Sequence, residues 1–230
     1  MKAVAIITAR GGSKRIPRKN IKPFLGQPII KYSIDAAIKS DIFSEVMVST
    51  DDKEIAEIAV KYGAKVPFFR SIKNSDDHST TADVIEEVLL EYGKHGQEFD
   101  YACCIYPTAP FVSAGRLKES MENLKSSGAD SALPVTRFSY PILRSLKIAD
   151  DGTLKMNWPE NINKRSQDLA PAYHDAGQYY CLDVKKFLVK KKLFTDNTLP
   201  IIVSELEVQD IDNEEDWQIA EMKYKLMGNK

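Results

Sequence analysis

Six cationic residues and no acidic residue fall within residues 10–22, directly after an apolar run. Gly11 and Gly12 stand among them, between Arg10 and Lys14. Like charges packed this closely repel one another, so the folded chain needs either water or an anion between them. Adjacent glycines let the backbone turn tightly and bring N–H groups close to phosphate oxygens. The segment therefore predicts a site at which Arg10 and Lys14 neutralise a triphosphate, and the simpler alternative is a solvated basic turn.

The order of glycines and cations departs from two common phosphate-binding motifs. A Walker phosphate loop requires G-x-x-x-x-G-K-[ST], whereas the two glycines are adjacent here and Ser13 precedes Lys14. The dinucleotide fingerprint G-x-G-x-x-G does not fit either. Lys19 lies at the far end of the same loop, where it would orient a phosphate. We therefore expect a nucleotide site of another class.

A second candidate site is the acidic stretch VQDIDNEEDW near the end of the sequence. Asp210 and Asp212 are two residues apart, so on an extended segment their carboxylates share one face and can flank a hard cation such as Mg²⁺. Asp210 is also a candidate general base, alongside a metal-bound water. The alternative role is the start of a helix, because Asp212 or Asn213 would cap it and the glutamates that follow suit its first turn.

Apolar, β-rich runs alternate with helical patterns as far as residue 136, and this order predicts how the candidate residues are held. The pattern predicts an α/β fold with a mainly parallel sheet covered by helices on both faces. Ligands of such sheets bind beyond the carboxyl ends of the strands, and the basic loop leaves the carboxyl end of the first strand. The expected strands are residues 2–8, 45–50, 65–69, 100–108 and 131–136, and the expected helices are residues 28–40, 53–63, 81–93 and 113–128, with Asp52 and Thr80 or Thr81 as caps.

The pattern changes at about residues 137–170, where two short extended pieces are joined by Asp150-Asp151-Gly152. Asp-Gly between extended runs is a hairpin signal. We expect an inserted arm that projects from a single domain and is covered by a second subunit; alternatively, it folds back on its own domain. The sheet is expected to resume at 176–182 and 200–206, and the last helix carries Trp217, Ala220, Tyr224 and Met227 on one core-facing side.

Composition limits the classes of function. The chain of 230 residues has 43% hydrophobic residues, 28% charged residues and a net charge of −1, which argues against bulk nucleic-acid binding. No apolar run approaches the ~20 residues that cross a bilayer, so we expect a cytoplasmic protein without membrane contact. Cys103, Cys104 and Cys181 show no zinc or disulfide spacing and are expected to be reduced core residues.

The stretch ARGGSKRIPRKNIKPFLGQPII closely resembles the opening of the cytidylyltransferases that activate nine-carbon acidic sugars, the CMP-sialic acid synthetase family. The resemblance implies a three-layer Rossmann-like nucleotide-diphospho-sugar transferase fold with a small projecting β arm, and a homodimer. Its members take CTP and an α-keto acid sugar and release pyrophosphate and a CMP-sugar. The D-I-D of VQDIDNEEDW matches the magnesium-binding D-x-D of this family, which assigns Mg²⁺ to Asp210 and Asp212.

The resemblance also implies nucleotide contacts outside the cations. Arg70 precedes a segment that matches the family near the cytidine, and the alternative is a plain surface arginine. His78 in that segment is expected to be a surface or capping residue. The full nucleotide set implied in this way is Ala9, Arg10, Gly11, Gly12, Ser13, Lys14, Asn20, Arg70, Thr80, Thr108 and Ala109.

The segments expected to bind the sugar differ from those of the sialic acid enzymes. Tyr106, in YPTAPF, stands where the family carries glutamine in Q-P-T-S-P, and HDAGQYY replaces P-N-G-A-I-Y. With KRSQDLAPAY upstream, the segment looks like the branch of the family that acts on pseudaminic acid for bacterial surface glycans on flagellin or capsule. The implied sugar contacts are Tyr106, Arg165, Gln167, His174, Gln178 and Tyr179. Arg165 would pair with the sugar carboxylate, whereas His174 could equally be structural.

Other functions are also compatible with the sequence. Sialic, legionaminic and Kdo cytidylyltransferases are alternatives within the enzyme class. A sensor that binds a cytidine nucleotide without turnover is the alternative from another class.

Overall fold

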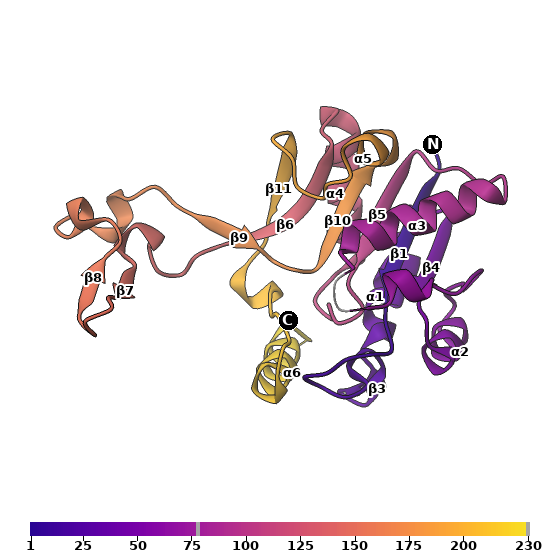
Figure 1. Ribbon diagram of the computed structural model, residues 1–230, viewed down its shortest axis with the longest axis horizontal. Helices are drawn as coiled ribbons and strands as arrows, with labels where there is room; N and C mark the ends of the chain where they lie inside the picture. Colours follow the sequence, from indigo (N-terminus) through magenta and orange to yellow (C-terminus); the bar gives the residue numbers. More distant parts are fainter. Residues whose placement is uncertain (77–78, 229–230) are drawn as a thin grey trace.

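The computed structural model describes residues 1–76 and 79–228, and its centre is a seven-stranded sheet with the order β11-β6-β10-β5-β1-β4 and with β9 paired to β6 (Figure 1). β1 is parallel to β4 and β5, and β6 is parallel to β11. β10 is antiparallel to both β5 and β6, between which it lies. The predicted α/β fold with a mostly parallel sheet is confirmed. The strands are β1 Ala3–Thr8, β4 Glu45–Ser49, β5 Tyr101–Ile105, β6 Ser131–Arg137, β9 Tyr173–Asp175, β10 Tyr179–Asp183 and β11 Thr198–Ile202.

Helices cover both faces of this sheet because successive strand residues point to opposite sides. In β1, Ala3, Ala5 and Ile7 belong to the core cluster under α1, α2 and α4, whereas Val4 and Ile6 belong to the cluster under α3 and α5. Cys103 and Cys104 divide in the same way and, like Cys181, are buried free thiols, as expected. The helices are α1 Ile30–Ser40, α2 Lys53–Lys61, α3 Thr81–Lys94, α4 Ala114–Ser127, α5 Val184–Lys190 and α6 Glu214–Gly228.

Side-chain caps fix where the helices near the site begin. The carboxylate of Asp52 accepts from the N–H of Ile55 at 3.0 Å and starts α2. Thr80 forms a capping box with Asp83 at the start of α3. These caps place both helix starts beyond the carboxyl ends of β1 and β4, which is where the basic loop also lies.

Two predicted boundaries are wrong. Residues 65–69 do not form a strand: Lys65 makes one bridge to Met47, and Pro67, which has no N–H, interrupts any further pairing. Pro28 does not open α1 but ends the short hairpin of β2 (Pro23–Phe24) and β3 (Gln27–Pro28). The turn of this hairpin uses positive φ at residues 25 and 26.

A third core cluster joins the basic loop to the end of the chain. Trp217 and Ala220 of α6 pack against Ile16, Phe24 and Ile211, with Tyr224 and Met227 alongside. This confirms the predicted core face of the last helix. As a result, α6 holds the basic loop and residues 208–213 against each other.

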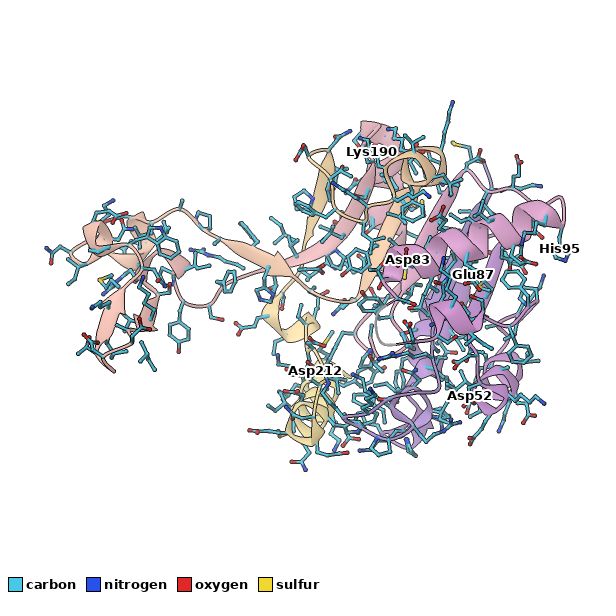
Figure 2. All side chains as sticks on the ribbon, viewed as in Figure 1. Asp52, Asp83, Glu87, His95, Lys190 and Asp212 are labelled. Atoms are coloured by element: carbon cyan, nitrogen blue, oxygen red, sulfur yellow. The ribbon has the colours of Figure 1, made fainter. Side chains whose placement is uncertain are left out.

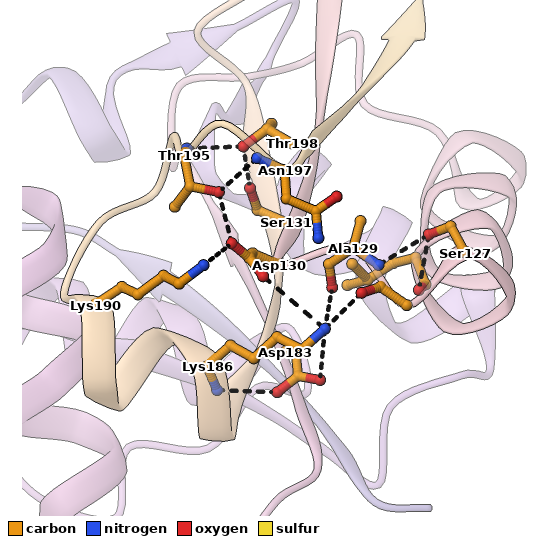
Figure 3. Close-up of polar contacts among 12 residues, drawn as sticks. Ser127, Ala129, Asp130, Ser131, Asp183, Lys186, Lys190, Thr195, Asn197 and Thr198 are labelled. Atoms are coloured by element: carbon orange, nitrogen blue, oxygen red, sulfur yellow. Dashed lines mark hydrogen bonds and ion pairs between the residues drawn. The ribbon is translucent and has the colours of Figure 1, made fainter.

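Asp130 organises the opposite end of the sheet (Figure 3). Its carboxylate accepts from Nζ of Lys190 at 2.5 Å and from Oγ1 of Thr195 at 2.7 Å, and Nζ of Lys186 lies 3.9 Å away. These contacts tie β6 to α5 and to the connection that leads into β11. Figure 2 shows Lys190 at one end of the sheet and Asp212 toward the other, so this cluster is remote from the basic loop.

The segment between β6 and β9 forms an arm that extends away from the main body (Figure 1). It contains a hairpin of β7 (Leu146–Ile148) and β8 (Leu154–Met156), as the Asp-Gly signal predicted. In this structure the segment does not fold back on its own domain. Within the described chain, no helix is long and apolar enough to cross a membrane.

Candidate active site

Two adjoining cavities open where β1 ends, and both are lined by Thr8 and Arg10. The first, which we call the basic cavity, has a volume of about 420 Å³ and is lined by Thr8, Arg10, Ser13, Lys14, Arg15, Lys19, Asn20 and Thr108. The second, which we call the polar cavity, has a volume of about 240 Å³ and is lined by Thr8, Arg10, Arg70, Asn74, Asp76, Ser79, Thr80, Thr81, Val84 and Tyr106. Together they form one cleft at the carboxyl end of the central strands, where an α/β sheet is expected to bind ligands.

The basic loop is closed by contacts to its own backbone and to the start of α2. Nδ2 of Asn20 donates to the carbonyl of Arg10 at 2.8 Å, and the N–H of Gly11 donates to Oδ1 of Asp51 at 2.9 Å. A β-carbon on Gly11 would meet the carboxylate of Asp52, whereas one on Gly12 would meet nothing within 4 Å. The N–H of Gly11, one of the N–H groups expected near phosphate, is thus engaged by Asp51 in this structure.

The six cations divide into two groups. Arg18 pairs with Asp52 at 2.5 Å, and Lys22 pairs with Glu214 at 2.5 Å, so these two fix the loop. Their partners keep both charges outside the basic cavity. The remaining four, Arg10, Lys14, Arg15 and Lys19, line the basic cavity and give it its positive charge.

The acidic segment borders the basic cavity through Arg15 and Lys19. Nη1 of Arg15 lies 2.6 Å from Oδ2 of Asp212, and Nζ of Lys19 lies 3.9 Å from its other oxygen. Nζ of Lys19 also donates to the carbonyl of Ile211, whose side chain is buried. Burial lowers the pKa of Lys19, and the nearby Asp212 and Asp210 act in the opposite direction.

Asn213 settles which residue caps α6. Its Oδ1 accepts from the N–H of Asp216 at 2.9 Å, so Asn213 starts the helix. Asp212, seen at the start of α6 in Figure 2, is left to interact with the cations of the basic loop. Asp210 is exposed and Asp212 is partly exposed, with buried Ile211 between them, so the two carboxylates lie on the same, outward side.

Arg70 is a buried arginine and not the plain surface residue of the alternative. Only 8% of it is exposed, and its guanidinium donates to the hydroxyl of Ser49 at 3.0 Å and to the carbonyl of Ser49 at 2.6 Å. In the parts of the chain that the structure describes, it forms no ion pair. Burial lowers the pKa of Arg70, and the charges of Asp51 and Glu87 offset this loss of hydration only in part.

Three other expected nucleotide residues have side chains that are already engaged. Ala9 and Ala109 are buried in the core, and the N–H of Ala9 donates to the carbonyl of Ser49 at 2.9 Å. The hydroxyl of Thr80 donates to Asp83 at 2.6 Å, at the edge of the polar cavity. Ser13 and Thr108 line the basic cavity. His78 lies outside the described residues.

The expected sugar contacts do not gather at one place. Tyr106 lines the polar cavity, with its hydroxyl 3.0 Å from that of Thr81. Gln178 is buried and donates to the carbonyl of Glu207. Tyr179 is 1% exposed, with its hydroxyl 2.8 Å from Ser120, on the face of the sheet that α4 covers. The structure therefore does not bring Gln178 and Tyr179 to the cleft.

The remaining three lie on the arm or at its base. Arg165 pairs with Asp168 at 3.0 Å, and Gln167 follows nearby in the same exposed segment. His174 is exposed on β9, bonds the carbonyl of Asp175 at 2.9 Å and contacts the ring of Phe138. The arm projects from the main body, so Arg165 and Gln167 are separated from the cleft of their own chain (Figure 1).

Sequence reasoning missed Tyr180 and Asp175. The Tyr180 ring contacts that of Tyr106 edge-on at 5.6 Å, and its hydroxyl donates to Asp175 at 2.7 Å. Asp175 in turn lines an apolar cavity of about 490 Å³ beside β6, β9 and β11. Strand alternation could have identified Tyr180. Tyr179 and Tyr180 are successive residues of a strand and must face opposite sides of the sheet, and Tyr106, at the end of β5, indicates which of these sides carries the cleft.

Comparisons with known proteins identify the family of the chain. Residues 4–227 match the family described as Cytidylyltransferase. The chain is 40% identical over 226 residues to a pseudaminic acid cytidylyltransferase of Campylobacter jejuni, a match that covers 98% of this chain and 97% of the relative. It is 31% identical to a CMP-N,N'-diacetyllegionaminic acid synthase of Legionella pneumophila, over 98% of this chain and 97% of the relative. A solved CMP:2-keto-3-deoxy-manno-octonic acid synthetase complexed with CTP superposes with a TM-score of 0.69 at 17% identity, over 100% of both chains.

Proposed function

The chain belongs to the cytidylyltransferase family, and we propose that it transfers CMP from CTP to pseudaminic acid, releasing pyrophosphate. The observation that carries this proposal is the continuous cleft at the end of β1, in which a cation-lined cavity adjoins a cavity containing a buried arginine. The similarity to the Campylobacter jejuni relative over nearly the whole of both chains supports the choice of sugar acid.

The two cavities suit the two ends of CTP. The polar cavity would take the cytidine, because among the described residues the guanidinium of Arg70 donates to a hydroxyl and a carbonyl and to no carboxylate. The basic cavity would take the triphosphate between Arg10, Lys14, Arg15 and Lys19. The anomeric hydroxyl of the sugar then attacks the α-phosphorus, and the four cations stabilise the charge that moves to the departing pyrophosphate.

Asp210 and Asp212 fit a divalent cation, which we propose to be Mg²⁺. Their carboxylates point to the same side, at the edge of the basic cavity. The described residues contain no cluster of three or more side chains that could ligate a metal, so the rest of the coordination sphere would come from phosphate oxygens and water, as is usual for Mg²⁺. When bound, the cation would neutralise and polarise phosphate oxygens.

The apolar cavity beside β9 suits a sugar acid with few exposed hydroxyls. It is separated from the polar cavity by the Asp175–Tyr180–Tyr106 contacts, and its lining includes Leu133 and Ile202. Pseudaminic acid carries two acylated amino groups and a terminal methyl group, which would bury apolar surface there.

We also propose a homodimer in which the arm of one chain packs on a second copy. In the arm hairpin, Ile148 pairs with Leu154 and Leu146 pairs with Met156, so one face of the ribbon is apolar. Ile148 is 76% exposed and Leu154 is 66% exposed. An isolated two-stranded ribbon is marginally stable in water, so this face needs cover.

A panel of sugar acids tests the function. Pyrophosphate release from CTP is measured with pseudaminic, legionaminic, sialic and 2-keto-3-deoxy-manno-octonic acids in turn. We expect pseudaminic acid to give the highest kcat/KM. A higher value for another acid would reassign the substrate, and recovery of intact labelled CTP with every acid would indicate a nucleotide-binding protein without turnover.

A further inference from the structure

The segment of residues 205–212, which contains Asp210 and Asp212, is attached to the main body largely through its backbone carbonyl groups. Nζ of Lys223, on α6, donates to the carbonyl of Val208 at 2.8 Å and to that of Glu205 at 3.2 Å. Nε2 of Gln178, which precedes β10, donates to the carbonyl of Glu207. Nζ of Lys19 donates to the carbonyl of Ile211. Side chains from three separate parts of the chain therefore hold four carbonyls of this segment, those of residues 205, 207, 208 and 211.

Apolar side chains of the same segment add a second kind of attachment. Val208 is 8% exposed and packs in the core under α1, α2 and α4, whereas Ile211 is 1% exposed and packs in the cluster beneath α6. Because carbonyls and apolar groups both face the body, Asp210 and Asp212 are directed outward, toward the cations of the basic loop.

The turn that precedes Val208 is fixed by one more contact. The guanidinium of Arg116, on α4, donates to both carboxylate oxygens of Glu207, at 3.0 and 3.1 Å. Of the carbonyls held in this way, that of Val208, bonded by Lys223, is the last one before Asp210 in the chain. Lys223 is partly buried and touches neither cavity of the cleft.

We propose that Lys223 and Gln178 are positioning residues that aim the carboxylates of Asp210 and Asp212 at the cation and phosphates of bound nucleotide. This inference rests on the proposed function. Groups that orient metal-binding residues typically change metal affinity by roughly tenfold or more when they are removed. Lys223 and Gln178 act through backbone carbonyls, so their loss shifts the carboxylates without removing a ligand.

The test uses the full chain and Mn²⁺ as the probe of cation binding in the presence of CTP. Lys223→Met keeps the length of the side chain and removes its charge, and Lys225→Met, on the same helix but exposed, is the matched control. Electron paramagnetic resonance measures Mn²⁺ held in the complex with protein and CTP, and calorimetry measures CTP affinity in chelator. We expect Lys223→Met to weaken Mn²⁺ affinity by about tenfold and to leave metal-free CTP affinity unchanged.

Two further variants sharpen the outcome. Lys223→Arg keeps the charge and should retain most of the wild-type Mn²⁺ affinity. Gln178→Met should show the same loss of Mn²⁺ affinity as Lys223→Met, so one of these two variants is enough for the test if the other does not fold. Wild-type Mn²⁺ affinity in Lys223→Met and Gln178→Met overturns the proposal, and so does a lowered Tm with no change in Mn²⁺ affinity. Failure of the wild type to release pyrophosphate with any sugar acid would contradict the proposed function instead, because the Mn²⁺ comparison does not depend on turnover.

Discussion

Gly11 and Asp52 are packed so closely that a β-carbon on residue 11 would lie 2.7 Å from Oδ2 of Asp52. Asp52 has little freedom to move aside, because its carboxylate caps α2 and accepts from both Nη atoms of Arg18. The first glycine of the basic loop is therefore required by its contact with α2, and the shape of the loop depends on that helix.

Gly11→Ala should destabilise the protein by about 1–3 kcal/mol, because the added methyl group forces the Asp52 carboxylate or the loop to shift. Gly12→Ala is the matched control, since a β-carbon there meets nothing within 4 Å. Urea unfolding of both variants checks this. Equal midpoints for the two variants would show that the loop relaxes without cost.

Acid should destabilise the protein below about pH 4. Hydrogen bonding from Arg18 lowers the pKa of Asp52, and hydrogen bonding from Arg116 lowers that of Glu207. Unfolded carboxyls titrate at about 3.9–4.3. The stabilisation is therefore complete above that range and is lost as pH falls through the lower, folded pKa values.

Arg18→Met tests the contribution of the Arg18–Asp52 pair. It should lower the free energy of unfolding by about 1 kcal/mol at pH 7. The free energies of unfolding at pH 7 and pH 3 should therefore differ by less than in the wild type. Lys118→Met, on the exposed side of α4, serves as the control. An unchanged pH dependence in Arg18→Met would show that the Arg18–Asp52 pair does not contribute.

Arg70→Met should separate stability from binding. Burial disfavours the guanidinium, whose pKa is lowered and whose partners on Ser49 are neutral, so its removal should leave Tm unchanged or raise it. CTP affinity should fall by roughly tenfold or more, in keeping with a lost hydrogen bond from a charged group. Calorimetry and a thermal melt measure the two effects. A lower Tm with unaltered CTP affinity would make Arg70 a structural residue.

Asp210→Asn and Asp212→Asn should each reduce kcat by about a hundredfold, near 3 kcal/mol in barrier, if these carboxylates hold the cation. Asp212→Asn should in addition free Arg15 and Lys19 from their ion pairs, so metal-free CTP should bind at least as tightly as in the wild type. Pyrophosphate release at a near wild-type rate in Asp210→Asn would exclude the metal assignment.

Ile148→Asp should weaken self-association, because it places a charge on the apolar face of the arm hairpin. Lys147→Asp adds the same side chain to the opposite face of the same strand and is the control. Light scattering across a concentration series should give a lower mass for Ile148→Asp alone. Identical masses for both variants would indicate that this face is not the contact.

The layers of the fold were predictable because their signals are local. Hydrophobic period, caps at Asp52 and Thr80, and the Asp-Gly hairpin signal each depend on a few neighbouring residues. The failures came from proline. Pro67 and Pro28 sit in stretches whose apolar pattern suggested a strand and a helix, but Pro67 prevents a strand from forming beyond the single bridge at Lys65, and Pro28 ends β3.

The candidate site was predictable only in part. The cation density of residues 10–22 predicted the cleft, but it could not tell Arg15, which lines it, from Arg18, which fastens the loop, since this depends on partners distant in sequence such as Asp212 and Asp52. The positions of Gln178 and Tyr179 away from the cleft could not be predicted for a similar reason. Tyr179 and Tyr180 are adjacent in sequence but belong to opposite faces of the sheet.

The projecting arm has a genetic consequence. Arg165 lies in the arm, between β8 and β9, and the arm projects away from the main body that carries Asp210 of the same chain, so any role for Arg165 in the reaction must be exerted on another molecule. Co-expression of a chain altered at Arg165 with a chain altered at Asp210 should then yield mixed pairs in which one complete cleft is assembled from two defective polypeptides. Such interallelic complementation would recover turnover that neither parent possesses.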